Sequence, residues 1–317
     1  MHYIRLMRPK DWVKNFFVLV PVLFWFNSPL NQDQLSLALV LSNTLITLVG
    51  FCLLASAVYS INDALDAEKD RSHPLKSRRP VASGAITASS AILFGCILGC
   101  GALVLGSLAG TGVFVVFLLY VLVQVFYNLA GKYLVLVDVV TISLGFVLRA
   151  AAGAFAVQIQ LSIWLVLCVF FLCLYLGFVK RLCDLSSARL AGSEEWRSRA
   201  GYDNPLELNW LLGVSGVMCL MMYLSYTLSE HAFLLFGART AGFAILTPLV
   251  LIVVHRFYRC ANEGRSDSPF TAIAEDRTIQ IGTLLFVAGV VVSLYVPAIE
   301  QLLSDLLLTT GQSLPAG

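Results

Sequence analysis

Residues 35–71 of this chain read LSLALVLSNTLITLVGFCLLASAVYSINDALDAEKDR. The first part, residues 35–61, is predominantly apolar and exceeds the length of about 20 residues that a helix needs to cross a bilayer. A polar segment with three aspartates follows without a break. At 100° per residue, the side chains of Asn62, Asp63, Asp66 and Asp70 fall within an arc of about 100°. The stretch therefore predicts a membrane-spanning helix that continues into a stripe of oxygen-bearing side chains.

The composition of the whole chain is typical of a membrane protein. Of its 317 residues, 58% are hydrophobic and only 13% are charged, whereas an ordinary soluble domain has roughly 25% charged residues. The mean hydropathy is +0.83. A soluble fold needs a polar outer face that this composition does not supply. A soluble enzyme, a nucleic-acid-binding module and a disordered chain are therefore excluded.

The pattern of apolar stretches predicts an all-α polytopic membrane protein with nine transmembrane helices, in a single integral membrane domain over residues 1–317. The first span is the weakest, because its strictly apolar part runs only from Phe16 to Phe26 and contains Pro21. No small-residue cleavage site follows it, which argues against a signal peptide. The predicted spans are residues 13–30, 35–61, 88–109, 111–129, 135–157, 161–179, 207–228, 240–258 and 279–301.

The distribution of basic residues predicts the orientation of these spans. All of the 21 Lys and Arg residues except Arg149 and Arg239 fall in the N-terminal arm, in the even-numbered connections, or at the span ends that adjoin them. Cytoplasmic loops are enriched in Lys and Arg. We therefore expect a protein of the inner (plasma) membrane with a cytoplasmic N-terminus and an external C-terminus. The long polar segments 62–87 and 180–206 place the active site on the cytoplasmic face, because long loops in compact domains are usually functional or disordered.

The acidic stripe predicts a divalent metal site. Carboxylates on one helical stripe repel one another unless a cation lies among them. Mg²⁺ is usually held by one or two carboxylates together with phosphate oxygens of the substrate. Asn62, Asp63, Asp66 and Asp70 are therefore the predicted Mg²⁺ ligands. The alternative is a solvated helix end with scattered acidic side chains.

A basic segment follows the acidic stripe at once, with the sequence His73-Pro74-Leu75-Lys76-Ser77-Arg78-Arg79-Pro80. Lys and Arg side chains supply charge-assisted hydrogen bonds to phosphate oxygens that a metal ion leaves unpaired. Lys76, Arg78 and Arg79 are therefore predicted to bind a phosphate or diphosphate group. The alternative is a positively charged cluster that only sets the membrane topology.

Arg149 lies in the middle of the fifth predicted span, where a charged side chain costs at least roughly 2.5–3.5 kcal/mol. Asp138 precedes it by about three helical turns and lies on the same helical face. One interpretation is a structural tie, in which Arg149 pairs with Asp138 or with a backbone carbonyl group. The other is a guanidinium group that faces a cavity and holds a phosphate.

Together these residues resemble the UbiA-type intramembrane prenyltransferases, and most closely their decaprenyl-phosphate phosphoribosyltransferase branch. The resemblance spans nearly the whole chain. It rests on Arg8-Pro9-x-x-Trp12-x-Lys14-Asn15, on Asn62-Asp63-x-x-Asp66-x-x-x-Asp70-Arg71-x-His73-Pro74-x-Lys76-x-x-Arg79-Pro80, on Asp138 with Gly145-Phe146-Val147-Leu148-Arg149-Ala150-x-Ala152-Gly153, on Lys180-Arg181, and on Arg256 with Pro269 and Asp276.

The resemblance implies nine helices around a central cavity that opens to the cytoplasmic face. It implies a catalytic Mg²⁺ site formed by Asp63, Asp66 and Asp70. Tyr127, Tyr175 and Tyr202 are candidates for lining the cavity, with ordinary packing as the alternative. The residues implied to bind substrate are Lys14, Asn62, Arg71, Lys76, Arg78, Arg79, Lys132, Asp138, Arg149, Lys180 and Arg181.

Two departures from the family pattern bear on these roles. The branch often has Tyr-Ser-x-x-Leu-Lys where this chain has Tyr127-Asn128-Leu129-Ala130-Gly131-Lys132, which puts the contact of Lys132 in question. The aromatic prenyltransferases of the superfamily have a second Asp-x-x-x-Asp motif where this chain has Lys180-Arg181-x-x-Asp184. This difference argues against a second metal site and favours an additional phosphate site.

The resemblance implies Mg²⁺-dependent transfer of a 5-phosphoribosyl group from phosphoribosyl diphosphate (PRPP) to a polyprenyl (decaprenyl) phosphate, with release of diphosphate. Such a product would feed the synthesis of lipid-linked pentose or arabinose donors for cell-envelope glycans. One alternative is prenyl transfer from a polyprenyl diphosphate to an aromatic acceptor such as 4-hydroxybenzoate. Another is a lipid or small-solute transporter. The expected partners are the two substrates and the bilayer, with no nucleic acid, and a homo-oligomer is left open.

Overall fold

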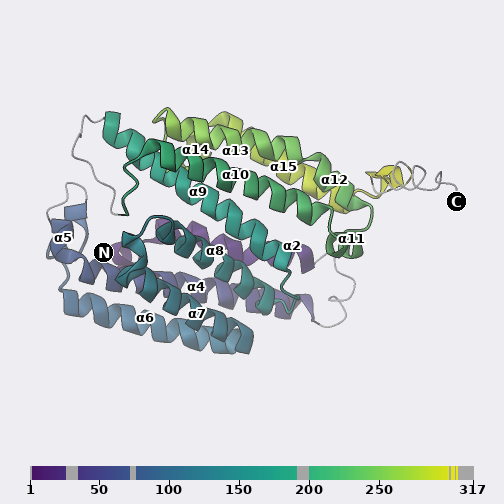
Figure 1. Cartoon of the computed structure of the whole chain (residues 1–317). Coiled ribbons are helices and arrows are strands. Elements are labelled where there is room, and N and C mark those ends of the chain that lie inside the picture. The colour runs from purple at the N-terminus through teal and green to yellow at the C-terminus, as the bar shows by residue number, and fades with distance from the viewer. Residues whose placement is uncertain are drawn as a thin grey trace. The chain divides into compact units, whose positions relative to one another are not determined.

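The computed structural model describes residues 2–25, 35–71, 76–190, 200–299, 301–303 and 305 of the chain. Within these residues all regular secondary structure is helical, which confirms the predicted all-α class (Figure 1). The helices, with η for 3₁₀ segments, are α1 (His2–Met7), η1 (Pro9–Leu19), α2 (Val20–Trp25), α4 (Leu37–Leu65), α5 (Ala67–Arg71), η2 (Lys76–Arg78), α6 (Ala88–Ala109), α7 (Thr111–Leu129), η3 (Gly131–Tyr133), α8 (Val137–Ala156), α9 (Ile163–Leu190), α10 (Pro205–Thr227), α11 (Glu230–Phe236), α12 (Arg239–Ile245), α13 (Thr247–Asn262), α14 (Pro269–Glu275) and α15 (Arg277–Tyr295).

Eight stretches of the described chain are long and apolar enough to cross a bilayer, and they correspond to the second through ninth predicted spans. They are Leu37–Leu65, Ala88–Ala109, Thr111–Tyr133, Val137–Ala156, Ile163–Ser187, Pro205–Thr227, Arg239–Asn262 and Arg277–Tyr295.

The predicted first span, residues 13–30, contains most of η1 and the short helix α2. Pro21 is the second residue of α2, a position in the first turn of a helix where proline is tolerated. Residues 26–34 lie outside the described part of the chain. A membrane crossing at this segment, and with it the total of nine, stays a prediction.

The chain divides into two compact units. Unit 1 comprises Met1–Lys132 and Leu144–Ser162, and unit 2 comprises Tyr133–Ser143 and Ile163–Gly317. In unit 1, α4 packs along α6 and also contacts η1, α1 and α7. In unit 2, α9 packs along α10, and α13 packs along α15. Helix α8 contributes residues to both units. The predicted single integral membrane domain over residues 1–317 stays a prediction.

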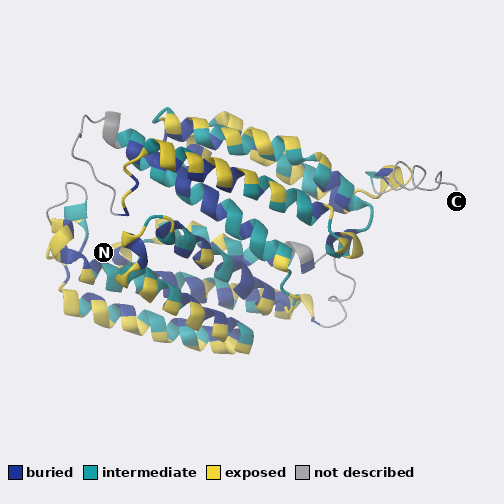
Figure 2. Ribbon diagram, viewed as in Figure 1, coloured by how far each residue is buried: buried dark blue, intermediate teal, exposed yellow. Residues whose placement is uncertain are grey.

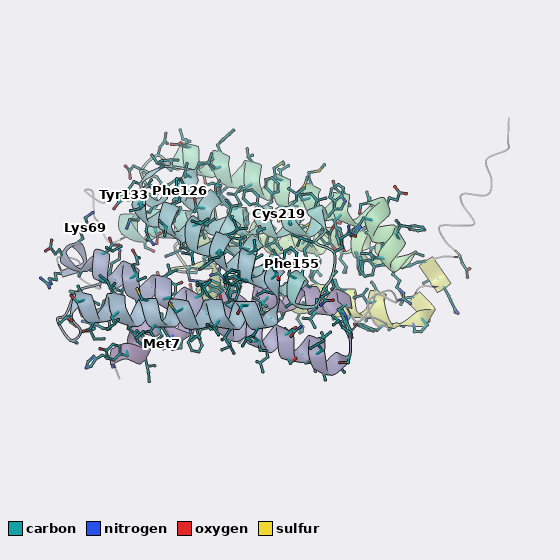
Figure 3. All side chains as sticks on the ribbon, turned by 90° about the horizontal axis from the view of Figure 1, so that it is seen from below. Met7, Lys69, Phe126, Tyr133, Phe155 and Cys219 are labelled. Atoms are coloured by element: carbon teal, nitrogen blue, oxygen red, sulfur yellow. The ribbon has the colours of Figure 1, made fainter. Side chains whose placement is uncertain are left out.

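Large apolar side chains are exposed on many of the helices. Figure 2 shows exposed positions along α6 in yellow. Phe126 on α7 and Phe155 on α8, both labelled in Figure 3, expose 49% and 43% of their surface. In water such exposure is unfavourable, but the hydrocarbon core of a bilayer is as apolar as these side chains. The exposed apolar faces therefore fit helices that contact lipid.

The core of unit 1 depends on close packing around the ring of Phe117. A Cβ atom added at Gly50 would lie 2.8 Å from this ring, and one added at Gly106 would lie 2.9 Å from it. Phe51 meets Phe117 edge to face at 4.8 Å and Tyr120 at 5.2 Å. Small residues that admit a neighbouring ring are typical of membrane helices, whose association depends on van der Waals packing.

In unit 2, an ion pair fixes the start of α15. Arg256 on α13 donates to Oδ2 of Asp276 from Nε at 2.9 Å and from Nη2 at 2.7 Å. Oδ1 of Asp276 accepts from the backbone N–H of Ile279 at 3.0 Å and so caps the helix. The hydrogen bonds from Arg256 lower the pKa of Asp276 to about 2. Because this pKa is depressed, the stabilisation is present above the ordinary aspartate value and is lost as the pH falls towards 2.

The contact between η1 and α8 in unit 1 generates a stability prediction. A Cβ atom at Gly153 would overlap the backbone carbonyl group of Val18, which cannot move aside as a flexible side chain can. We expect Gly153→Ala to destabilise the protein by about 1–3 kcal/mol, the usual penalty for overpacking. Thermal unfolding of the purified protein in detergent measures this loss.

Gly213→Ala in α10 is the matched control, because nothing lies within 4 Å of an added Cβ there. Alanine is the better helix former by up to about 1 kcal/mol, so this variant should melt at the same temperature as the natural protein or higher. Equal melting temperatures for the Gly153 and Gly213 variants would contradict the close approach of η1 to α8.

Candidate active site

The acidic stripe lies where α4 ends in unit 1. Helix α4 runs to Leu65, and α5 begins at Ala67 after a turn at Asp66. Asp63, Asp66 and Asp70 are only 2%, 5% and 2% exposed. Three buried carboxylates in this short stretch are inconsistent with the alternative of a solvated helix end. They are stable there only if charged partners accompany them.

Two arginines neutralise the first and last members of the stripe. Nη2 of Arg8 donates to Oδ1 of Asp63 at 2.5 Å. Nη1 of Arg79 donates to the same oxygen at 3.2 Å and to Oδ2 of Asp70 at 2.6 Å. Arg79, one of the residues predicted to bind phosphate, therefore bridges two predicted metal ligands.

Lys132 neutralises the middle member. It lies in η3, just after α7, and its Nζ donates to Oδ1 of Asp66 at 3.2 Å. The side chains of Lys132 and Asp66 are 5% and 7% exposed, so this ion pair is almost fully buried. The contact joins Lys132 to the acidic stripe, whereas its contact with a substrate stays a prediction. Arg8, Arg79 and Lys132 together balance the charges of the three aspartates.

Arg8 is the member of this cluster that the sequence predictions did not select. It occurs in the N-terminal motif, but its partner Asp63 lies 55 positions later in the chain. Its backbone has φ 51°, a left-handed conformation that costs a non-glycine residue about 1–3 kcal/mol. Its guanidinium carbon lies 4.8 Å from the centre of the Tyr59 ring. The contacts with Asp63 and Tyr59 compensate this strain.

The side chains of the stripe fit a hard metal ion in chemistry, but a metal-binding arrangement is not assembled among the described residues. No group of three or more His, Cys, Asp and Glu side chains in that part of the chain is placed to hold a metal ion. Each aspartate of the stripe instead faces a basic side chain. The Oδ1 atom of Asn62 is buried and has no hydrogen-bond partner. An unsatisfied amide oxygen next to three carboxylates is a ligand set that Mg²⁺ accepts.

The remaining basic candidates of unit 1 lie nearer the surface. Nζ of Lys14 donates to Oδ1 of Asp11 at 2.7 Å. Lys76 is half-buried in η2, whereas Arg78 and Arg71 are exposed. Residues 72–75, which include His73 and Pro74 of the motif, lie outside the described part of the chain.

Arg149 is held by neutral groups. Its Nε donates to Oδ1 of Asn15 at 2.8 Å, its Nη1 to the carbonyl oxygen of Gly145 at 2.8 Å, and its Nη2 to the hydroxyl of Tyr120 at 3.0 Å. The guanidinium carbon also lies 5.0 Å from the centre of the Tyr120 ring and 5.1 Å from that of Phe146. The residue is 5% exposed. These contacts favour the structural interpretation, in which Arg149 ties α8 to η1 and α7.

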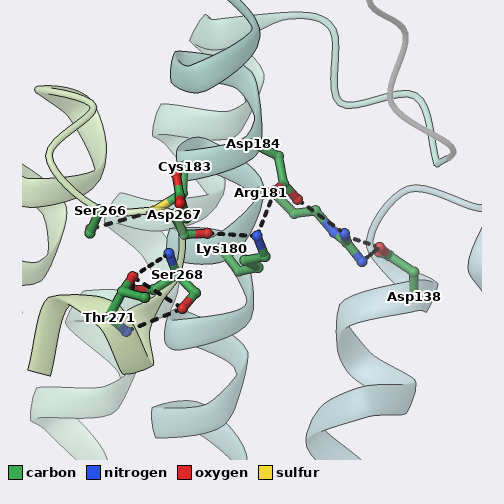
Figure 4. A network of polar contacts seen from close by, with 9 residues as sticks. All are labelled: Asp138, Lys180, Arg181, Cys183, Asp184, Ser266, Asp267, Ser268 and Thr271. Carbon is green, nitrogen blue, oxygen red and sulfur yellow. Dashed lines mark hydrogen bonds and ion pairs between the residues drawn. The ribbon is translucent and has the colours of Figure 1, made fainter. Parts of the chain in front are cut away.

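The candidates of unit 2 form a separate network, shown in Figure 4. Asp138, at the start of α8, accepts hydrogen bonds from Arg181 on α9. Lys180 donates to Oδ1 of Asp184 at 2.7 Å and to the carbonyl oxygen of Asp267 at 2.6 Å, so it fastens α9 to the segment before α14. The sequence marks Tyr202 only as a candidate for lining a cavity, yet its hydroxyl lies 2.5 Å from Oδ1 of Asp138.

Most of the predicted site residues therefore fall into three groups. The first group, in unit 1, contains the acidic stripe with Arg79 and Lys132. It also includes Arg8, which the sequence did not predict as a site residue. The second, also in unit 1, surrounds Arg149. The third, in unit 2, contains Asp138, Lys180 and Arg181.

Known proteins resemble this chain over most of its length. The UbiA prenyltransferase family matches residues 17–275. A decaprenyl-phosphate phosphoribosyltransferase of Mycolicibacterium smegmatis is 29% identical over 295 residues, which cover 92% of either chain. A protein of the same name from Mycobacterium tuberculosis is 30% identical over 288 residues, which cover 90% of this chain and 92% of the relative. The chain thus belongs to the UbiA prenyltransferase family.

A solved structure supports the same fold. A UbiA homologue from Archaeoglobus fulgidus, bound to GPP and Mg²⁺, superposes with a TM-score of 0.67 at 20% sequence identity. The match covers 93% of this chain and 100% of the homologue. Membership of the family and the apolar helices make the chain an integral multi-pass membrane protein and a transferase.

The buried pair of Asp66 and Lys132 generates a second prediction. Asp66→Asn leaves the charge of Lys132 buried without its carboxylate partner, and we expect a loss of about 3–5 kcal/mol of stability. In the double variant Asp66→Asn/Lys132→Met both charges are absent, so most of the stability should return. Thermal unfolding in detergent distinguishes the two variants.

Glu263→Gln is the control for this pair. Its partners Arg259 and Arg265 have side chains that are 51% and 59% exposed, and exposed ion pairs contribute little to stability. We expect its melting temperature to stay close to that of the natural protein. A double variant no more stable than Asp66→Asn alone would show that the two charges do not compensate each other.

Proposed function

We propose that this chain transfers a 5-phosphoribosyl group from PRPP to a polyprenyl phosphate of the decaprenyl type and releases diphosphate. The observation that carries the proposal is the buried stripe of Asp63, Asp66 and Asp70, interleaved with Arg8, Arg79 and Lys132. Carboxylates for a metal ion and cations for phosphate oxygens are what a metal–diphosphate substrate requires. The names of the two bacterial relatives support the choice of a phosphoribosyl donor.

The chemistry of the leaving group matches these residues. Breakage of the bond between the anomeric carbon and the diphosphate builds positive charge on the ribose and negative charge on the departing oxygens. Mg²⁺ held by Asn62, Asp63, Asp66 and Asp70 would supply Lewis-acid stabilisation of the leaving diphosphate. Arg8, Arg79 and Lys132 lie at those same carboxylates and would donate charge-assisted hydrogen bonds to diphosphate oxygens.

The three cations serve two purposes in this proposal. Without a substrate they neutralise the buried aspartates, whose mutual repulsion would otherwise destabilise the end of α4. When the donor and its metal ion arrive, Arg8, Arg79 and Lys132 exchange their carboxylate partners for phosphate oxygens. The exchange keeps every buried charge paired, because an unpaired buried charge is strongly destabilising.

The acceptor needs no general base from the protein. A phosphate monoester has a second pKa of about 6 and is largely dianionic at pH 7. Its oxygen attacks the anomeric carbon in line with the departing diphosphate, which inverts that centre. The 5-phosphate of the donor and the acceptor phosphate are assigned to the remaining basic candidates, namely Lys14, Arg71, Lys76, Arg78, Lys180 and Arg181.

The membrane setting follows from the acceptor. Each CH₂ group removed from water contributes about 0.8 kcal/mol, so a polyprenyl chain stays in the bilayer while the sugar donor arrives from the cytoplasm. We propose an inner (plasma) membrane location with the N-terminus and the active site on the cytoplasmic side and the C-terminus outside. The support is the concentration of Lys and Arg on one side of the predicted spans. From the resemblance alone, we propose that the product supplies lipid-linked pentose or arabinose donors for cell-envelope glycans.

A transfer assay tests the proposed reaction. Purified protein in detergent is given ribose-labelled PRPP and a polyprenyl phosphate, with Mg²⁺ or with a chelator. We expect the label to enter the lipid fraction and diphosphate to be released in equal amount. Chelation of Mg²⁺ should abolish the transfer, because the leaving diphosphate then lacks its Lewis acid.

A parallel assay with a polyprenyl diphosphate and 4-hydroxybenzoate tests the alternative. Prenylation of the aromatic acid, with the ribose label absent from the lipid fraction of the first assay, would overturn the proposal in favour of aromatic prenyl transfer. Transfer of ribose that persists in full after chelation would remove the assignment of Asp63, Asp66 and Asp70 to a catalytic metal ion.

A further inference from the structure

An apolar groove lies between α10 and α13 in unit 2, and Tyr175 of α9 also lines it. The two helices contact each other (Figure 1), and the groove has a volume of about 290 Å³. On α10 its lining positions run from Asn209 to Leu220 at helical spacing, and on α13 they run from Leu251 to Tyr258. Apart from one asparagine, one histidine and two tyrosines, all of the lining residues are apolar. The groove is therefore suited to a hydrocarbon group.

Two glycines of α10 shape the groove. A Cβ atom added at Gly216 would lie 3.3 Å from the ring of Tyr175, whose hydroxyl donates to a carbonyl oxygen of α13 at 2.7 Å. A Cβ atom added at Gly213 would meet nothing within 4 Å, so this position leaves the groove unfilled. The lining side chains of Val217 and Leu251 are 59% and 52% exposed. The groove is therefore open to the surrounding bilayer.

The dimensions of the groove match one acyl chain of a phospholipid. From Asn209 to Leu220, α10 rises by about 16 Å, and one leaflet contributes about 15 Å to the hydrocarbon core. An apolar cavity of about 150 Å³ takes up one benzene molecule, so the groove has room for a longer, slender chain. An acyl chain extends through one leaflet, whereas a polyprenyl chain of ten units is much longer than one leaflet is thick.

The polar lining residues gather at one end of the groove. Asn209 lies near the start of α10, and His255 and Tyr258 lie near the end of α13. The Oδ1 atom of Asn209 is buried and has no hydrogen-bond partner among the described residues. His255 is exposed, although it lies within the apolar span Arg239–Asn262. An unpaired buried acceptor and an ionisable side chain in a membrane span are both unfavourable unless a partner compensates them.

The same end of α13 carries surplus positive charge. Arg259, one helical turn after His255 on the same face, shares the single carboxylate of Glu263 with Arg265. The two arginine side chains are 51% and 59% exposed. Glu207, in the first turn of α10, lies on the helix face opposite to the groove. The charge at this end therefore favours an anionic headgroup, and neither arginine has to leave Glu263.

We propose that this groove binds a phospholipid of the phosphatidylglycerol type, which has an anionic phosphate and a hydroxyl-bearing headgroup. One acyl chain lies along the apolar lining, a headgroup hydroxyl donates to Oδ1 of Asn209, and the phosphate accepts from His255 and Tyr258. The predicted orientation puts this end of the groove at the cytoplasmic face, where basic residues attract anionic lipids. The site is separate from the proposed reaction, because none of its lining residues is a predicted metal or phosphate ligand.

Native mass spectrometry of the full-length protein in detergent tests the proposal. Lipid-stripped protein is titrated with a phosphatidylglycerol and, separately, with a phosphatidylcholine of the same acyl chains, whose headgroup has no hydrogen-bond donor. We expect the phosphatidylglycerol to bind at least about three- to tenfold more tightly, the effect of one hydrogen bond. Asn209→Leu should weaken the binding of phosphatidylglycerol by the same factor and leave that of phosphatidylcholine unchanged.

Gly213→Phe tests the position of the acyl chain. It should weaken both lipids by about tenfold or more, because the phenyl ring displaces two or more CH₂ groups from the groove. Val214→Phe is the matched control, since Val214 is 44% exposed on the same helix and does not line the groove. This variant should bind both lipids as the natural protein does. If Gly213→Phe fails to fold, Gly213→Leu carries the same test with a smaller side chain.

Three results would overturn the proposal. Phosphatidylglycerol that binds equally well to Gly213→Phe and to the natural protein would lie elsewhere. Equal affinity of the natural protein for the two phospholipids would remove the headgroup assignment. A polyprenyl phosphate whose binding is sensitive to Gly213→Phe, while phosphatidylglycerol does not bind, would be the occupant instead. The proposed function stands or fails separately, by the transfer of labelled ribose.

Discussion

The burial of three carboxylates at the end of a membrane helix is the constraint that organises unit 1. Removal of a carboxylate from water costs several kcal/mol even after the protein has relaxed. Asp63, Asp66 and Asp70 are nevertheless at most 5% exposed. The N-terminal arm, the segment after α5 and the short helix η3 each bring one cation to the stripe. The left-handed backbone at Arg8 and the burial of Lys132 are consequences of this requirement.

The protein stabilises buried charge in three ways. The acidic stripe is matched by an equal number of cations, which in the proposed function exchange partners when the diphosphate and its metal ion bind. Asp138 accepts hydrogen bonds from Arg181, Tyr202 and its own helix. Arg149 relies on neutral hydrogen-bond acceptors and aromatic rings, whose faces attract cations. Only the first of these arrangements holds several like charges side by side, which is why we assign it to the metal–diphosphate substrate.

A basic side chain in a phosphate-handling membrane enzyme is therefore not necessarily a phosphate ligand. The hydrogen bonds of Arg149 to Asn15 and Tyr120 join α8 to η1 and α7. Arg149 occurs in a family motif, and a motif does not distinguish a ligand-binding residue from one that holds helices together. The distinction depends on which acceptors surround the charge in the folded chain and on how much of it water reaches.

The amino-acid sequence by itself determined the all-α membrane class, eight of the spans, and the acidic stripe on one face of the helix that ends near residue 65. These features depend on local properties, namely the length of apolar runs and the helical period, which need no knowledge of the rest of the chain. Only the tertiary structure decided the partners. Arg8 meets Asp63 across 55 positions, Lys132 meets Asp66 across 66, and Tyr202 meets Asp138 across 64. No local pattern encodes such pairs, because the need to neutralise a buried charge specifies the kind of partner but not the segment of the chain that supplies it.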